Sequence, residues 1–144
     1  MTKARAAARL AAVQALYQHE MQATRLPKLL DEFHQHRLGA EIEDMQFAKA
    51  ETAFFDDVVS GVIARRDEVD AVISGKLAEG WSLARLDRTM LQILRAGTYE
   101  LMARADVPTG SAISEYVDVA HAFFEAREAK FVNGVLDAVA KSVR

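Results

Sequence analysis

The side chains of this sequence that could recognise a ligand lie near its two ends. Lys3, Arg5 and Arg9 stand in the first residues, and residues 1–19 contain no acid. Near the other end, Lys130 and Phe131 stand beside Asn133. A lysine neutralises phosphate and an exposed aromatic ring stacks on a base, so these residue types are typical of single-stranded RNA binding. The alternative for Phe131 is an ordinary position in the core.

The N-terminal cations belong to a helix predicted over residues 3–22. Its apolar face recurs at helical spacing: Leu10, Val13, Leu16 and Tyr17. Arg5 and Arg9 are four residues apart, so they share another face. Cations in the first turns oppose the helix dipole by roughly 0.3–1 kcal/mol, which indicates an anionic ligand. A solvated, frayed N-terminus is the alternative.

The C-terminal candidates begin a second distinctive helix. Its apolar stripe is Val132, Val135, Leu136 and Val139. Gly134 lies inside this helix, where glycine costs roughly 1 kcal/mol relative to alanine. Asn133 is also a poor interior residue because its side chain competes for backbone hydrogen bonds. Two explanations are open, a tight helix–helix crossing or a polar group required at a fixed place, and for Gly134 we expect packing.

The residues between these ends predict further helices. Pro27 suits the first turn of a short helix. A long helix is expected from about Asp44 to Ala78, with Gly61 and Gly75 as candidates for a kink and an end.

The second half of the chain begins with a helix that Asp87 can cap. This helix is apolar on most sides, so we expect it to be central; its Arg95 and Glu100 are five residues apart, so each needs another partner. Thr109 or Ser111 can cap the following helix. The chain therefore predicts an all-α fold, a compact bundle of six to seven helices in one domain, residues 1–144.

Composition sets limits on the class of protein. With 51% hydrophobic and 27% charged residues, the 144-residue chain is typical of a globular domain. The absence of cysteine excludes disulfides and thiol chemistry. No apolar run approaches the roughly 18 residues of a membrane span, and no signal peptide is evident, so a cytoplasmic location without membrane contact is expected. The net charge of −3 excludes a globally basic nucleic-acid binder but not a locally basic one.

Signals of catalysis are missing from the sequence. It has no glycine-rich phosphate loop, nucleophile elbow or HExxH motif. Its four histidines have no partners at metal-ligand spacing. Asp56 and Asp57 are adjacent, so they diverge on a helix, and no other group is expected to converge on them. We therefore expect a binding module, with no cofactor, no metal and no enzymatic activity.

Several motifs in this order are similar to those of one family. They are Ala8-Arg9 with Ala12 to Tyr17, Leu94-Arg95-Ala96 with Tyr99-Glu100-Leu101, Asp106-Val107-Pro108 with Ala112-Ile113 and Glu115, and Lys130-Phe131-Val132-Asn133-Gly134-Val135-Leu136-Asp137. Across nearly its whole length, the sequence resembles the NusB family of bacterial transcription antitermination factors.

The resemblance implies an all-α fold of two packed helical subdomains. It also implies binding of boxA-type single-stranded RNA in ribosomal RNA leaders, jointly with the small-subunit ribosomal protein NusE, and action on the RNA polymerase antitermination complex. The RNA-binding residues that it implies are Lys3, Arg5, Arg9, Gln14, Tyr17, Lys130, Phe131 and Asn133.

The sequence departs from the family pattern in places. Ala6, Ala7 and Ala8 replace part of an arginine cluster, so RNA affinity is expected to be weaker or more dependent on the partner. Ser114 and Phe124 also differ from the family, as does the segment 125–129 that borders the partner surface. Three alternatives are open: a homodimer, a purely protein-binding helical adaptor, and a fragment of an RNA methyltransferase with a similar N-terminal domain.

Overall fold

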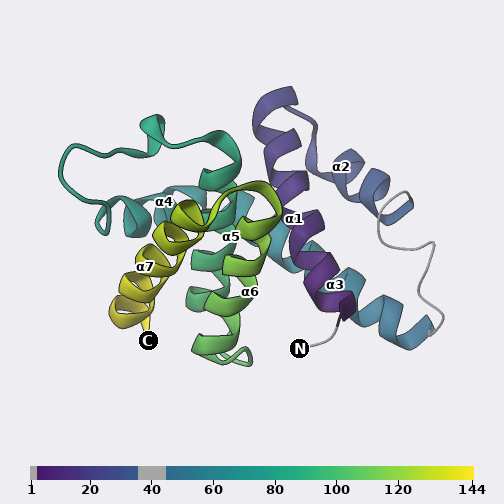
Figure 1. The fold of residues 1–144 in the computed structure, drawn as a ribbon. Helices are drawn as coiled ribbons and strands as arrows, with labels where there is room; N and C mark the ends of the chain where they lie inside the picture. The colour runs from purple at the N-terminus through teal and green to yellow at the C-terminus, as the bar shows by residue number, and fades with distance from the viewer. Residues whose placement is uncertain (1–2, 36–44) are drawn as a thin grey trace.

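The structure, a computed structural model, describes residues 3–35 and 45–144 and is helical throughout (Figure 1). The α-helices are α1 (Lys3–Gln22), α2 (Leu26–Phe33), α3 (Met45–Ala64), α4 (Arg66–Ser74), α5 (Arg88–Ala103), α6 (Thr109–Phe123) and α7 (Ala126–Val143). A short 3₁₀ turn, η2 (Leu83–Arg85), lies between α4 and α5. No strand occurs in the described ranges, so the predicted all-α fold is confirmed.

The helices pack as two groups that share one core. Helices α1, α2 and α3 lie together on one side, and α4 to α7 lie together on the other (Figure 1). Helix α5 joins the groups because it contacts α1 and α3 as well as α6 and α7. Every residue from Met90 to Leu101 is buried, which confirms that α5 is the central helix. None of the described helices has both the length and the hydropathy needed to cross a bilayer.

The prediction of one long helix over residues 44–78 is wrong. Helix α3 ends at Ala64, and α4 starts anew after Arg65, whose φ of −113° and ψ of 24° are not helical. The apolar period continues through this break because Val69 and Ile73 of α4 are buried in the same core. The spacing of apolar residues in the sequence therefore cannot locate the turn at Arg65. The prediction that Gly75 marks a helix end is confirmed, since Gly75 is the C-cap of α4. Asp44, the predicted start, lies outside the described residues.

Helix α3 continues past Gly61 to Ala64, and the glycine there allows close packing. A Cβ atom added there would lie 2.1 Å from the Cζ atom of Tyr99 in α5. No alanine fits at this point unless the tyrosine ring moves. The glycine thus lets α3 approach the central helix closely.

One of the two predicted caps is correct. The Asp87 carboxylate accepts hydrogen bonds from the backbone N–H groups of Thr89 (2.8 Å) and Met90 (3.1 Å), as expected for the start of α5. Neither Thr109 nor Ser111 caps α6, because the N-cap residue is Pro108, with no side-chain bond. Pro108 has an extended ψ of 144° and a side chain without a hydrogen-bond acceptor, so it precedes α6 without capping it.

The expectation that packing explains Gly134 is also wrong. This glycine is exposed, and no atom lies within 4 Å of the position its Cβ would take. The close crossing of α7 occurs instead at Gly97 of α5, where a Cβ would lie 2.9 Å from a methyl carbon of Leu136. The glycine that allows α7 to pack closely against the core is therefore Gly97 of α5, not Gly134 of α7.

Candidate nucleic-acid interface

The N-terminal half of α1 is fixed to α5 by a buried ion pair. The Arg9 guanidinium is 0% exposed and donates two parallel hydrogen bonds to Glu100, from Nε to Oε2 (2.9 Å) and from Nη2 to Oε1 (2.9 Å). The Tyr116 hydroxyl of α6 donates to the same carboxylate. Glu115 lies 3.6 Å from Arg9 Nη1 and is a second carboxylate beside the same guanidinium. Three helices therefore meet at Glu100.

The electrostatics of this cluster keep Arg9 charged and Tyr116 neutral. Burial alone would lower the pKa of Arg9, but the hydrogen bond and the charge of Glu100 outweigh burial and raise it. Burial also raises the pKa of Tyr116 well above its usual value, and the Glu100 charge adds to this effect. Tyr116 therefore stays a neutral donor and Arg9 a cation. A bidentate, fully desolvated pair of this kind is rigid and geometrically specific.

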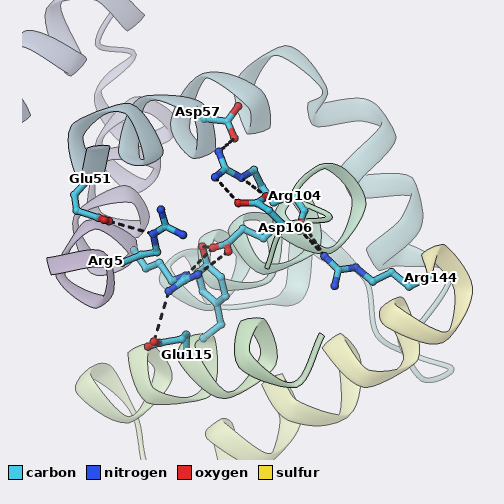
Figure 2. A network of polar contacts seen from close by, with 10 residues as sticks. Arg5, Glu51, Asp57, Arg104, Asp106, Glu115 and Arg144 are labelled. Atoms are coloured by element: carbon cyan, nitrogen blue, oxygen red, sulfur yellow. Dashed lines mark hydrogen bonds and ion pairs between the residues drawn. The ribbon is translucent and has the colours of Figure 1, made fainter. Parts of the chain in front are cut away.

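Three arginines surround the buried ring of Phe54 in α3. The guanidinium carbons of Arg5, Arg9 and Arg104 lie 4.4, 4.9 and 5.0 Å from the ring centroid, within the range of cation–π contact. Arg5 donates to Glu51 (3.2 Å), and Arg104 pairs with both Asp57 and Asp106, as Figure 2 shows. Carboxylates of this chain thus neutralise the basic cluster.

Arg144 joins the same network from the C-terminal end. Its guanidinium donates to the carbonyl oxygen of Leu101 (2.9 Å) and, as Figure 2 shows, to that of Arg104 (2.8 Å) at the end of α5. The last carbonyls of a helix lack intrahelical partners, so a cation there satisfies them and complements the dipole. Arg144 also donates to the Thr109 hydroxyl (3.0 Å), which occupies the predicted capping group in another bond.

The C-terminal half of α1 is fixed at a second point. Glu20 accepts hydrogen bonds from Gln92 (2.6 Å) and Arg95 (3.2 Å), and Arg95 forms a bidentate pair with Asp70 of α4 at 2.8 and 2.9 Å. The expectation that Arg95 and Glu100 have separate partners is confirmed. Helix α1 is therefore held on α5 near both of its ends.

The structure corrects the interpretation of the N-terminal arginines. Arg9 was predicted as an RNA contact, but its side chain is enclosed and bound to Glu100, so it presents no surface to a ligand. The alternative of a solvated terminus is equally wrong for Arg9. Arg5 is partly exposed and pairs with Glu51. The anions expected near these arginines are thus carboxylates of the same chain. The side chain of Lys3 lies outside the described residues.

Gln14 and Tyr17 come together at a surface hollow. With Val13, Thr89 of α5 and Phe123 of α6, they line a cavity of about 190 Å³. Tyr17 is 40% exposed and Phe123 is 42% exposed. Two aromatic rings at the rim of a small hollow can hold a flat or apolar group. Phe123 is a candidate functional residue that the sequence does not indicate, since its exposure depends on where α6 ends.

The predicted residues of α7 form a second group. Lys130 and Asn133 are exposed on its outer face, as expected for ligand contacts. Phe131 is half-buried: it packs against the core but is not enclosed by it, so its role as an RNA contact stays a prediction. Among the described side chains, no hydrogen bond or ring contact joins this group to Gln14 or Tyr17. In the chain, the short turn between α6 and α7 separates Phe123, at the hollow, from the residues of α7.

The expectation that nothing converges on Asp56 and Asp57 is wrong. The His34 imidazole of the α2 end lies 2.6 Å from Asp56, and the Tyr99 hydroxyl donates to Asp57 (2.7 Å). Adjacent aspartates do diverge on α3, yet each meets another helix. These contacts tie helices together, and the described residues contain no group of three potential metal ligands.

These features define an all-helical binding module, with a rigid interior and polar and aromatic groups on α1, α6 and α7. The NusB family model matches residues 6–141 of the chain. The transcription antitermination protein NusB of Novosphingobium aromaticivorans is 77% identical over 99% of this chain and 96% of that protein. The corresponding protein of Sphingopyxis alaskensis is 66% identical over 99% and 95%.

Solved structures give the same result. NusB from T. maritima superposes with a TM-score of 0.81 at 32% identity, covering 98% of this chain and 93% of that one. A structure of the antitermination factors NusB and NusE in complex with double-stranded RNA matches with a TM-score of 0.82 at 25% identity, covering 99% of both chains. The chain belongs to the NusB family.

Proposed function

We propose that this protein is a transcription antitermination factor that binds boxA-type RNA together with ribosomal protein NusE and acts on elongating RNA polymerase. The observation that carries the proposal is the 77% identity, over almost the whole chain, to a curated transcription antitermination protein. The NusB and NusE structure with RNA supports both partners. In this proposal residues 1–144 act as one domain in the cytoplasm, without a cofactor or enzymatic activity.

In this proposal each exposed side chain contacts a different part of the RNA. Lys130 neutralises a phosphate, Asn133 donates or accepts a hydrogen bond, and Phe131 offers its exposed edge to a base. Gln14 and Tyr17 supply polar and stacking contacts at the hollow on α1. Lys3 and Arg5 contact phosphates at the N-terminal end of α1, and Arg5 shares its charge with Glu51. Arg9 acts indirectly, because its bond to Glu100 holds α1 in position.

A gel-shift assay tests the proposal. We expect boxA RNA to bind more tightly than a scrambled RNA of equal length, and more tightly still with NusE present. Because lysine and arginine contacts release counterions from the phosphates, added salt should weaken binding steeply. Single-stranded and self-paired forms of boxA are compared in parallel. No preference for boxA over scrambled RNA, with NusE present, would refute the proposal.

A matched pair of lysine variants localises the site. Lys130→Ala should lower RNA affinity and reduce the salt dependence by about one phosphate contact. Lys28→Ala is the control: Lys28 is also exposed, with 75% of its side chain accessible, but lies on α2. Equal losses in the two variants would indicate nonspecific attraction and would remove α7 from the site.

The second candidate is a purely protein-binding adaptor. The aromatic rim of Tyr17 and Phe123 favours it, because a small apolar hollow also fits a protein side chain. A pulldown would then recover NusE regardless of ribonuclease treatment, and no RNA would bind at any salt concentration.

A further inference from the structure

The chain's single tryptophan stands on the surface beside the predicted RNA-binding end of α7. Trp81 is 52% exposed and lies in the connection between α4 and α5, just before η2. Its ring centroid is 6.4 Å from that of Phe131, with the planes tilted by 46°. Burial of a tryptophan is strongly favourable, so a half-exposed indole beside a second aromatic ring leaves a large apolar surface uncovered. No internal packing requirement explains that exposure.

The connection that carries Trp81 is held in a fixed shape. Gly80 has a φ of 88°, which places the turn in a conformation suited to glycine. The Arg88 side chain donates to the carbonyl oxygens of Leu83 (2.7 Å) and Leu86 (2.6 Å) and so ties η2 to the start of α5. The indole is therefore positioned before any ligand arrives.

Arg85 lies beside the Trp81 ring, and Lys130 directly precedes Phe131 in the chain. The Arg85 guanidinium lies 5.7 Å from the Trp81 ring centroid and donates to the Gly80 carbonyl. Lys130, next to Phe131, is exposed and has no ion pair with any residue that the structure describes. In the segments 76–88 and 126–134, cations outnumber acids: Lys76, Arg85, Arg88, Arg127 and Lys130 against Glu79, Asp87 and Glu128. The whole chain is acidic, so this is a local excess.

We propose that Trp81 and Phe131 form a stacking surface for a base of single-stranded RNA, with Arg85 and Lys130 contacting its phosphates. This inference rests on the proposed RNA binding and extends it to the α4–α5 connection, which contains none of the predicted RNA-binding residues. Exposed aromatic rings combined with a cationic margin are what sequence-tolerant single-strand binding uses. The surface would therefore take a nucleotide that flanks the recognised element, with little preference among bases.

Fluorescence of Trp81 provides a direct readout because the chain has no other tryptophan. The protein with NusE is titrated with boxA RNA that carries single-stranded flanks and, separately, with boxA RNA that lacks them. A Trp81→Phe variant sets the background emission of NusE. We expect flanked RNA to quench the Trp81 emission and the core RNA to quench it less.

Variants separate stacking from charge. Trp81→Ala should weaken binding of flanked RNA about tenfold, and Trp81→Phe should retain most of the affinity, because stacking of one base contributes about that much. Arg85→Gln should weaken binding and reduce its salt dependence. Lys28→Gln, which removes an exposed charge from α2, is the control and should change neither. Circular dichroism and thermal melting confirm that each variant is folded.

The outcomes distinguish this inference from the proposed function. If wild-type protein prefers boxA but Trp81→Ala binds flanked RNA equally well, or the emission does not respond, the inference is wrong and the proposed function stands. If Trp81→Ala weakens binding of NusE without RNA, the surface is a protein site and the inference is again wrong. Trp81-dependent RNA binding without boxA preference would support the stacking surface and refute the proposed function.

Discussion

Two basic stretches of the chain have similar sequence character and opposite surroundings. At the start of α1, Arg9 is completely enclosed between α3, α5 and α6 and bound to Glu100. At the start of α7, Lys130 and Asn133 are exposed, and the nearby Gly134 has open space above it. The first stretch holds the bundle together, and the second is available to a ligand.

The difference shows what a cation in a helix does and does not reveal. An arginine that opposes the helix dipole indicates that an anion is needed, but the sequence does not say whose anion it is. For Arg9 the anion is Glu100, 91 residues further along the chain. For Lys130 no such carboxylate is found among the described residues. The following variants test this contrast and the packing between helices that produces it.

Arg9→Ala should cause the largest loss. It would leave the Glu100 carboxylate buried without its counter-charge, which costs about 3–5 kcal/mol in the free energy of unfolding. Urea denaturation followed by circular dichroism measures the loss. Arg5→Ala is the control, because Arg5 is partly exposed and its ion pair contributes about 1 kcal/mol or less.

A combined variant identifies the cause of that loss. Arg9→Met, Glu100→Leu and Tyr116→Phe together remove the charges and the hydroxyl while keeping apolar volume. This protein should be more stable than Arg9→Ala alone, since no buried charge remains unpaired. If it were less stable, the cost would come from lost packing around Phe54 and not from the isolated carboxylate.

Gly61→Ala should destabilise the protein by about 1–3 kcal/mol, which is typical of overpacking. The new methyl group would lie 2.1 Å from the Tyr99 ring and would displace it from Asp57. Chemical denaturation provides the measurement. Tyr99→Leu removes the obstructing ring atoms, so adding Gly61→Ala to that variant should cost little. A large further loss would show that the backbone of α3 is the obstacle.

Tyr99→Phe should cost about 1 kcal/mol at neutral pH, since it removes the hydrogen bond to Asp57. Burial and the neighbouring Asp57 raise the pKa of Tyr99 to about 12, above the value of roughly 10 for an unfolded chain. The neutral hydroxyl therefore stabilises the fold fully below about pH 10, and this contribution is lost as the pH rises toward 12.

Denaturation of both proteins at about pH 8 and about pH 11 tests the sign of this effect. The difference in stability between wild-type protein and Tyr99→Phe should shrink at the higher pH. Other groups that titrate there are present in both proteins and cancel. A difference that stayed constant would mean that the hydrogen bond to Asp57 does not form in solution.

Gly134→Ala should have the smallest effect, and of the opposite sign. Because the added methyl group meets nothing, the variant should gain up to about 1 kcal/mol from helix propensity. A thermal melt measures the gain. Gly97→Ala is the matched control in α5, where the new Cβ would press against Leu136 and should destabilise the protein. A destabilised Gly134→Ala would contradict the open surface of α7.

Local features of the fold were predictable and contacts between helices were not. The central position of α5 followed from its apolar residues, and its Asp87 cap followed from residue type, because both depend on a few neighbouring residues. The turn at Arg65 was missed since both α3 and α4 bury the same apolar period. The candidate site divides in the same way: Lys130 is exposed as expected, whereas the exposure of Trp81 depends on how its connection packs against α7.

The sequence by itself determined that the chain is helical, which faces are apolar, and to which family it is similar, because periodicity and each motif are formed by residues close together in the chain. Only the tertiary structure decided which arginine binds inside the protein and which glycine admits a second helix. Those outcomes depend on pairs such as Arg9 with Glu100 and Gly97 with Leu136. Such pairs are far apart in the chain, and the packing of α1 and α7 on α5 brings them together.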